Sequence, residues 1–309
     1  LESVHSQNYL FNLTQQQDKV ITEIAALAPS AEVRTRYKSA FNGFQVLIDP
    51  SKAAALLKLE AVKRVYPDRR RSLLLDSSTE VINAPTLWDD LGGPANAGEG
   101  IRIAVIDTGI RSGNPMFEGT ADFVQPPGFP HGYCADFPAD LEFQCNDKLI
   151  VARYYEPLFN IHADEVRSPL DIHGHGSHVA GIAAGNPVEV PEGIVIPETT
   201  AISGVAPMAY LMVYKALFLE PDGGVTGSDS MFLAALDDAL LDGADVINNS
   251  WGESENRNPD DSPYQTVLAA LNAAGVVVVF AAGNGGPNES TIHCPGCLED
   301  AFTVGATTA

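Results

Sequence analysis

Alternating strand and helix patterns over residues 101–309 constrain the fold of this chain most strongly. Short apolar runs that are rich in β-branched residues predict strands buried on both faces. Strands are expected at Ile101–Ile106, Leu211–Leu217, Asp245–Asn249 and Val276–Phe280, with helices at Ser228–Leu241 and Tyr264–Ala274. This order predicts an α/β protein with a doubly wound parallel sheet, right-handed crossovers and helices on both faces.

Three polar residues stand where such strands and helices begin or end. Asp107 follows the strand IRIAVI, and Asn284 follows VVVVF in a turn of very small residues, AAGNGG. His175 lies in DIHGHGSHVAGIAAG, which predicts a loop leading into a tightly packed helix with Val179 and Ile182 on its apolar face. Because open α/β sheets carry their chemistry at the carboxyl ends of the strands, these residues are candidates for one active site.

The same segments resemble the motifs of the subtilases, a family of subtilisin-like serine peptidases. AVIDTGI (104–110) is similar to the aspartate motif of the family, HGSHVAG (175–181) to its histidine motif, and AAGNGG (281–286) to its oxyanion-asparagine motif. SGVAP (203–207) and INNSW (247–251) resemble two further family segments in the same order. The resemblance covers residues 101–309 and implies a secreted serine endopeptidase that acts on protein and peptide substrates.

This resemblance implies a role for each motif in peptide hydrolysis. His175 would be the general base, Asp107 would orient its imidazole, and Asn284 would donate its amide to the tetrahedral oxyanion. Two extended segments would hold the substrate backbone as an added strand, beside a pocket for the residue before the scissile bond. The substrate-binding residues expected are Gly224, Val225, Ser250, Trp251, Gly252, Ala282 and Gly283. A purely structural place in the core is the alternative for Trp251.

The nucleophile motif of the family, GTSMA followed by proline, does not occur in this chain. We therefore expect a peptidase domain (101–309) that is incomplete at its C-terminus, with the catalytic serine beyond residue 309. Residues 1–309 alone are then expected to be inactive. The remaining C-terminal part of the peptidase domain is an expected partner.

Residues 1–75 predict a small α+β domain in front of the peptidase domain. The expected elements are a helix at 2–28, strands at 32–37 and 41–48, a helix at 51–59 and a last strand at 62–66. This is a ferredoxin-like order that lacks its first strand. It resembles the subtilase propeptide, which implies a zymogen whose own propeptide is an intramolecular inhibitor. An independent accessory domain is the alternative.

Residues 76–100 are expected to form a processing linker and the segment that leads into the peptidase domain. A basic triplet, residues 69–71, precedes polar residues, so we place propeptide cleavage within 69–83; a solvated charge run is the alternative. Residues 112–170 predict a long insertion that is rich in proline, glycine and aromatic residues and has no sustained period. Leu1 in place of Met indicates that an upstream segment has been removed or omitted.

Cysteine and charge content indicate an exported protein. The cysteines fall into two local pairs, Cys134 with Cys145 and Cys294 with Cys297. Two disulfides explain them better than a redox or zinc site, because no second CxxC accompanies CPGC. Residues 81–309 hold 7 Lys and Arg against 31 Asp and Glu, which is typical of a solubility surface and argues against nucleic acid as a partner. No apolar run is long enough to span a membrane.

The histidines at 173, 175 and 178 form an HxHxxH pattern that is compatible with a metal site. We prefer to exclude metal ligation, because the resemblance assigns His175 to catalysis and zinc sites of this sort need a further ligand. His178 is expected to be a packed helix residue and His173 a loop residue. The chemistry requires no cofactor, and for structural calcium, which some relatives bind near residues 186–202, no ligands are assigned.

Two other classes of function fit the same residues. A catalytically silent subtilase fold would serve as a binding or scaffold module, and its continuing reading frame would lack GTSMA. A propeptide-type inhibitor or folding chaperone would act through residues 1–75 and would inhibit a subtilase in trans.

Overall fold

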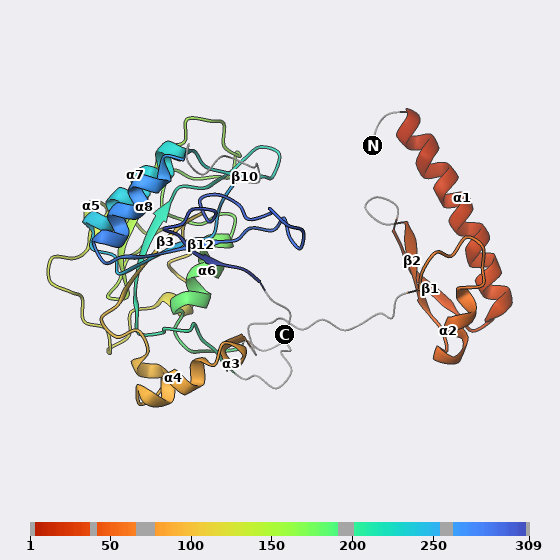
Figure 1. Cartoon of the computed structure of the whole chain (residues 1–309), viewed down its shortest axis with the longest axis horizontal. Coiled ribbons are helices and arrows are strands. Elements are labelled where there is room, and N and C mark those ends of the chain that lie inside the picture. Colours follow the sequence, from red (N-terminus) through yellow and green to blue (C-terminus); the bar gives the residue numbers. More distant parts are fainter. Residues whose placement is uncertain (1–3, 38–41, 66–77, 191–200, 254–261, 307–309) are drawn as a thin grey trace. The chain divides into compact units, whose positions relative to one another are not determined.

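The computed structural model describes residues 4–37, 42–65, 78–190, 201–253 and 262–306. The chain divides into two compact units, Leu1–Arg71 and Ser72–Ala309, here called the N-terminal unit and the C-terminal unit (Figure 1). Each unit has its own apolar core, so each is described by itself.

The N-terminal unit packs helices against a two-stranded antiparallel sheet. Its elements are α1 (Val4–Leu27), β1 (Glu32–Tyr37), β2 (Gly43–Leu47) and α2 (Pro50–Leu56). Val20 and Ile24 of α1 and Leu56 of α2 form its buried core. α2 begins after Asp49, whose carboxylate accepts hydrogen bonds from the N and Oγ atoms of Ser51 and so caps the helix.

The predicted last strand of this unit is not formed. Residues 62–65 have no strand pairing in the described part of the chain, and Tyr66 lies outside it. Val62 and Val65 nevertheless pack against the core. The prediction of a strand is wrong for a physical reason: in the ferredoxin-like arrangement the last strand pairs with a first strand, and the described residues contain none ahead of α1.

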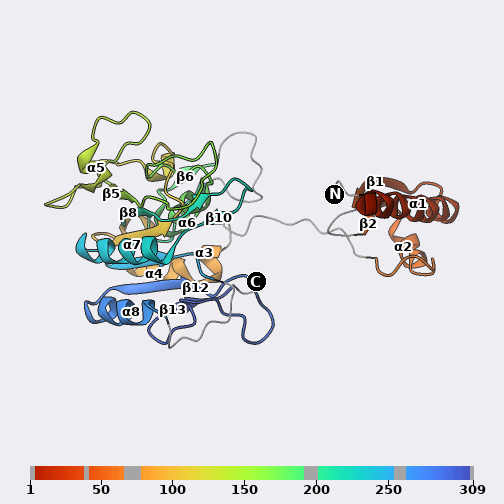
Figure 2. The ribbon, with the colours of Figure 1, turned by 90° about the horizontal axis from the view of Figure 1, so that it is seen from above.

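The C-terminal unit is built on a seven-stranded sheet in which all strand pairs are parallel. The strand order is β13-β12-β11-β3-β8-β5-β4, and Figure 2 shows β5 and β8 toward one side of the sheet and β12 and β13 toward the other. The strands are β3 (Arg102–Asp107), β4 (His131–Gly132), β5 (Leu149–Tyr154), β8 (Tyr210–Lys215), β11 (Val246–Asn249), β12 (Val277–Ala281) and β13 (Phe302–Val304). The predicted parallel α/β fold is confirmed.

Helices cover both faces of this sheet (Figure 1). α7 (Asp229–Leu241) and α8 (Tyr264–Ala273) pack on the face that includes Ile106. α6 (His175–Ala184) packs on the opposite face, which includes Val105. Because successive residues of a strand point to opposite faces, the apolar run of β3 contributes side chains to the cores on both faces of the sheet. The strand ends at Asp107, at the carboxyl edge of the sheet.

The buried face of α6 differs from the prediction. The buried residues of this helix are all very small: Gly176, Ala180, Gly181 and Ala184. Ile182 is 37% exposed, and His178 is also exposed. The predictions of a packed His178 and of an apolar face through Ile182 are therefore wrong, because the helix lies too close to its neighbours for large side chains on its inner face.

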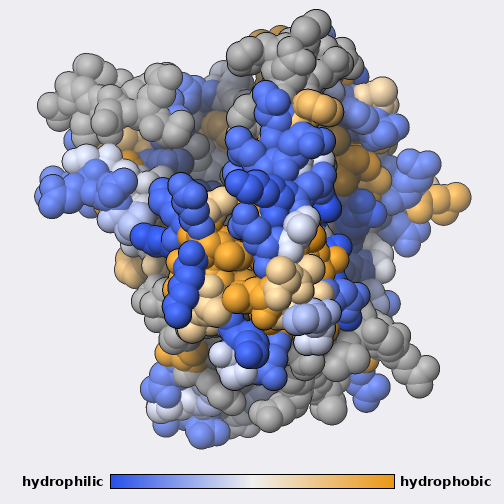
Figure 3. Space-filling model, turned by 90° about the vertical axis from the view of Figure 1, so that its right-hand side faces the viewer, coloured by the Kyte–Doolittle hydropathy of each residue, from blue (hydrophilic) through white to orange (hydrophobic). Residues whose placement is uncertain are grey.

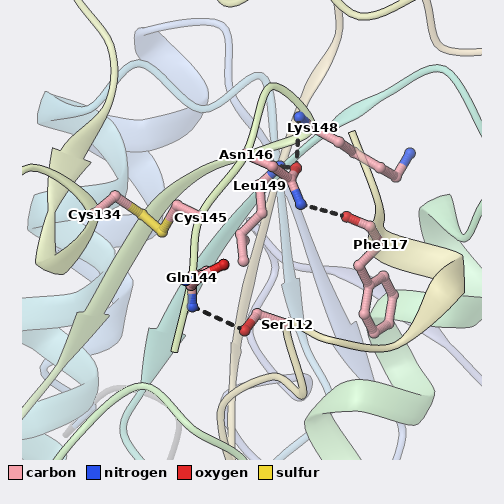
Figure 4. Close-up of a disulfide and its surroundings, with 8 residues drawn as sticks. All are labelled: Ser112, Phe117, Cys134, Gln144, Cys145, Asn146, Lys148 and Leu149. Atoms are coloured by element: carbon pink, nitrogen blue, oxygen red, sulfur yellow. Dashed lines mark hydrogen bonds between the residues drawn. A yellow bond between two sulfur atoms is a disulfide. The ribbon is translucent and has the colours of Figure 1, made fainter. Parts of the chain in front are cut away.

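The segment predicted as an insertion without regular structure supplies part of the sheet. Leu149, Ile150, Val151 and Ala152 of β5 are fully buried. The Cys134–Cys145 disulfide precedes this strand, and Figure 4 shows how the connection is held. Asn146 Nδ2 donates to the carbonyl oxygen of Phe117 at 2.9 Å, and Asn146 Oδ1 accepts from the backbone N–H groups of Lys148 and Leu149. This part of the chain is thus ordered by a disulfide and by one amide side chain.

The remaining described elements are short. They are α3 (Ser78–Val81), α4 (Ala84–Asp90), α5 (Tyr133–Asp136), β6 (Val188–Glu189), β7 (Ala201–Ile202), β9 (Phe218–Leu219) and β10 (Val225–Thr226), with 3-10 turns at Pro94–Asn96 and Pro115–Phe117. Trp88 of α4 donates its Nε1–H to the carbonyl oxygen of Val205 at 2.9 Å, which fixes this helix to the C-terminal unit. Most of the predicted cleavage region, 69–83, lies outside the described residues.

On the face of the molecule seen in Figure 3, hydrophilic side chains surround a central apolar patch. Among the described helices, none is both long and apolar enough to cross a membrane.

Candidate active site

Asp107 and His175 form a direct hydrogen bond. Asp107 is the last residue of β3 and has no exposed surface, whereas His175 is the first residue of α6 and its side chain is 44% exposed. The distance from His175 Nδ1 to Asp107 Oδ1 is 2.8 Å. Since a carboxylate can only accept, the bond assigns the proton of the neutral imidazole to Nδ1 and leaves the lone pair on Nε2. Within the described chain, no hydrogen bond engages Nε2, so the exposed side of the ring is available to a reacting group.

This contact depends on two glycines. A Cβ atom on Gly176 would clash with the carbonyl oxygen of Gly109, and a Cβ atom on Gly109 would clash with the carbonyl oxygen of Pro169. Gly109 also has a φ of +102°, a left-handed conformation that other residues rarely adopt. The turn after β3 and the start of α6 therefore approach each other closely only because both positions lack a side chain.

The surroundings of His175 favour its charged form. The hydrogen bond to Asp107 is the main cause of a raised pKa of His175, and the negative charges of Asp107 and Asp171 add to it. Partial burial of the ring acts in the opposite direction. A base that has just accepted a proton is an imidazolium, so this environment stabilises the state that general-base catalysis produces.

Asn284 lies at the same edge of the sheet as the Asp107–His175 pair. It follows β12, which is separated from β3 by one strand, β11, and all three strands run in the same direction. Its side chain is exposed, and Gly283 beside it has a φ of +89°. A Cβ atom on Gly283 would clash with the ring of His293, so this turn also requires glycine.

The predicted substrate-binding residues occupy three segments. Val225 is the first residue of β10, which pairs antiparallel with β9, and Gly224 precedes it in the turn, where its carbonyl oxygen accepts from Glu220 N. Ser250, Trp251 and Gly252 follow β11, and Ser250 Oγ accepts a hydrogen bond from Asn248 Nδ2.

Ala282 and Gly283 follow β12, where the backbone of Ala282 bonds Val304 and His293. The disulfide Cys294–Cys297, present as predicted, lies next to this segment, and Glu253 N donates to the carbonyl oxygen of Cys294 at 3.0 Å.

Trp251 packs on the core. Its ring stacks on Phe232 of α7 with centroids 3.8 Å apart, and the rings of Tyr264 and Phe280 lie at 5.7 and 5.4 Å. The indole is partly buried, and its Nε1 has no hydrogen-bond partner among the described residues. These contacts favour the structural alternative over a free pocket wall.

In the described part of the chain, no group of three or more His, Cys, Asp or Glu side chains is arranged to hold a metal ion. The rings of His173 and His175 are 6.2 Å apart and tilted, and His175 already bonds Asp107 through Nδ1. The bond between His175 Nδ1 and Asp107 Oδ1 supports an acid–base function of His175.

The sequence motifs do not predict the groups that support the Asp107–His175 pair. Asp171, Thr108 and Ser177 form a buried hydrogen-bond network around the start of α6. Lys215 and Glu165 form a fully buried ion pair at 2.7 Å near the same loop. The available signal was the position of Asp171, four residues before His175 in the histidine motif.

A parallel α/β sheet with a buried Asp–His pair at its carboxyl edge resembles the arrangement by which Ser-His-Asp hydrolases activate a nucleophile. The chain belongs to the subtilase family: the sequence model described as Subtilase family matches residues 98–309. A second model, Peptidase inhibitor I9, matches residues 2–74. The family predicted from the motifs is confirmed, together with an inhibitor-type N-terminal region.

Relatives from a plant and a bacterium are similar along most of this chain. It is 34% identical over 269 residues to Subtilisin-like protease SBT2.5 of Arabidopsis thaliana. The aligned region covers 83% of this chain and 32% of that relative. It is 32% identical over 295 residues to Minor extracellular protease Vpr of Bacillus subtilis (strain 168). The aligned region covers 90% of this chain and 31% of that relative. The chain thus spans about a third of the length of these relatives.

Proposed function

We propose that this chain is the propeptide and the larger part of the peptidase domain of a secreted serine endopeptidase of the subtilisin type. The observation that carries the proposal is the contact between Asp107 Oδ1 and His175 Nδ1 at 2.8 Å. It orients Nε2 as the base that takes the proton of a serine hydroxyl and later returns it to the leaving amine. Asn284 donates its side-chain amide to the oxyanion of the tetrahedral intermediate.

The serine of this proposal lies on a segment beyond residue 309. An uncovered apolar face of the sheet supports this assignment: Val277 is 48% exposed, Phe302 63% and Val304 50%. Val279 and Phe302 are register partners, so these side chains lie on the face of β12 and β13 opposite to Val278 and its α8 cover. A further segment of the same domain that packs on this face would exclude water from it and would stand beside the edge that carries Asn284.

The domain assignment follows from the same proposal. Residues 1–75 are the inhibitory propeptide, 76–100 the processing linker and the segment that leads into the domain, and 101–309 the incomplete peptidase domain. The match of residues 2–74 to an inhibitor family supports the first assignment. The description of Vpr as an extracellular protease and the two disulfides of this chain support an extracellular location.

Fluorophosphonate labelling of the product of the complete reading frame tests the proposal. The reagent modifies only an activated serine, so we expect labelling of the processed protein and its loss in His175→Ala. A folded and processed protein that does not react would refute the peptidase assignment and favour the silent binding module. Robust proteolysis by residues 1–309 alone would refute the assignment of the serine to a later segment.

A further inference from the structure

Asp171 is a buried carboxylate that lies between the aspartate and histidine motifs. It has no exposed surface. Its Oδ1 accepts hydrogen bonds from Thr108 Oγ1 at 2.9 Å and from Gly174 N at 2.7 Å, and its Oδ2 accepts from the N and Oγ atoms of Ser177 at 2.9 and 2.6 Å. Four donors satisfy both oxygens, which is the condition under which a carboxylate is stable away from water.

The four donors come from both sides of the candidate active site. Thr108 follows Asp107 directly, and its Oγ1 also accepts from Gly176 N at 2.8 Å. Gly174 and Ser177 flank His175 at the start of α6. Asp171 therefore connects the end of β3 to the first turn of the helix that carries His175, through side chains that are independent of the bond between Asp107 and His175.

The position of Asp171 is itself fixed by its neighbours. Asp171 N donates to the carbonyl oxygen of Ile110, and Ile110 N donates to the carbonyl oxygen of Pro169. The carbonyl oxygen of Leu170 accepts a hydrogen bond from Lys215 Nζ at 2.6 Å. Lys215 is fully buried and ion-paired with Glu165, so a rigid group anchors the residue before Asp171.

The charge of Asp171 has a specific electrostatic consequence for His175. His175 is the first residue of α6, and the positive end of a helix dipole disfavours a cation at that position. A buried carboxylate that caps the same helix end places a negative charge there and offsets the dipole. Among the described residues, the other titratable groups that face the imidazole are Asp107 of β3 and His173 of the same loop.

We infer that Asp171 is a positioning residue for His175, which fixes the first turn of α6 against Thr108 and supplies the negative charge that allows an imidazolium at the positive end of this helix. The inference rests on the proposed role of His175 as general base. In this role the carboxylate of Asp171 orients the imidazole of His175 and increases its basicity, and Asp171 itself does not contact the substrate.

NMR titration of the His175 imidazole tests the inference without any need for turnover, so it is independent of whether the protein is a peptidase. Asp171→Asn removes the charge and keeps one acceptor oxygen. We expect the proton affinity of His175 to fall by about threefold to tenfold in this variant. An unchanged affinity in a folded Asp171→Asn protein would overturn the inference.

Two further variants separate charge from structure. Asp164→Asn removes an acidic side chain that is 84% exposed in the same region of the chain, and it is expected to leave the His175 titration unchanged. Ser177→Ala removes one hydrogen bond of Asp171 and keeps the charge, so it should lower the melting temperature and leave the proton affinity near the wild-type value. A fall in affinity as large as that of Asp171→Asn in either variant would overturn the electrostatic assignment.

If Asp171→Asn does not fold, a comparison of Thr108→Ser with Thr108→Val tests whether the link through Asp171 positions His175. Serine keeps the hydroxyl that bonds Asp171, and valine removes it at similar volume. We expect the downfield Nδ1 proton resonance of His175, which reports its bond to Asp107, to persist in Thr108→Ser and to broaden or disappear in Thr108→Val. Persistence of the resonance in a folded Thr108→Val protein would show that the link through Asp171 does not position His175.

Discussion

Asp107 and Asp171 are two fully buried carboxylates that are joined by a single residue. The N–H of Thr108 donates to Asp107 Oδ1 at 2.7 Å, and the hydroxyl of Thr108 donates to Asp171 Oδ1 at 2.9 Å. One carboxylate then bonds the ring of His175, and the other bonds the backbone on both sides of it. The histidine is therefore held through its side chain and its main chain by groups that are connected to each other.

Replacement of Asp107 by asparagine should abolish most of the activity of the complete enzyme. An amide can donate to Nδ1, which favours the tautomer with its proton on Nε2 and so blocks the base. We expect kcat to fall by about 10⁴-fold, with little change in KM, as measured with a peptide substrate. Asp164→Asn is the matched control and should retain full activity. A loss of less than about tenfold in Asp107→Asn would contradict the assigned role of this pair.

The pH dependence of activity should report the raised pKa of His175. The base must be neutral to accept a proton, so kcat/KM should fall as the pH decreases through a pKa that lies above the ordinary value of 6.5. The contribution to stability has the opposite direction: it is complete below the pKa of the unfolded chain and is lost as the pH rises through the folded pKa. Measurements of kcat/KM and of melting temperature from about pH 5 to 9 check both directions. An acidic limb below 6.5 would contradict the prediction.

Lys148 should make the stability of the C-terminal unit depend on pH above neutrality. It is fully buried, its Nζ donates to the carbonyl oxygens of Pro207 and Ala209, and burial lowers its pKa from 10.5 to about 7. Between these two values the unfolded chain binds one proton more than the folded chain, so stability should rise with pH. The rise should be absent from Lys148→Met, as followed by melting temperature.

Arg167→Met is the control for that experiment, because it removes an exposed cation that does not titrate in this range. It should retain the wild-type slope. The same slope in Lys148→Met would show that the proton uptake belongs to another group.

The Cys134–Cys145 disulfide should stabilise the segment that leads into β5. The cysteines are 11 residues apart, and closing a loop of this size reduces the entropy of the unfolded chain. The double replacement by serine should lower the free energy of unfolding by about 3 kcal/mol, as measured by denaturant titration. The Cys294–Cys297 pair, 3 residues apart, closes a shorter loop and should cost about 2 kcal/mol. An unchanged free energy in the first variant would contradict this account.

The central strands could be predicted because their own residues determine them. β3, β8 and β12 contain continuous apolar runs, and such runs are typical of strands that are covered on both faces. The same reasoning could have identified β5, whose run Leu149–Ala152 is equally apolar, but the polar residues around it concealed the pattern. The missing strand at 62–65 shows the limit of a local pattern, because a strand also needs a partner.

The three motif residues of the candidate site could be predicted from the sequence, but the hydrogen-bonded and ion-paired residues around them could not. Asp107, His175 and Asn284 stand in short motifs, whereas the partners of Asp171 are distant in sequence: Thr108 is 63 residues away. The pairing of Lys215 with Glu165 likewise spans 50 residues. Such networks depend on the close approach of β3, β8 and the loop before α6, which only the folded chain defines.

The burial of Lys148 and Lys215 has a practical consequence for chemical labelling. They are the only lysines between residues 72 and 309, and neither has exposed surface. In the N-terminal unit, by contrast, Lys19, Lys52, Lys58 and Lys63 are exposed. An amine-reactive dye applied to the folded chain should therefore mark the N-terminal unit and spare lysines of the C-terminal unit. After cleavage within 69–83, the dye would remain on the released propeptide, so the separation of the dye from the C-terminal unit would measure propeptide release.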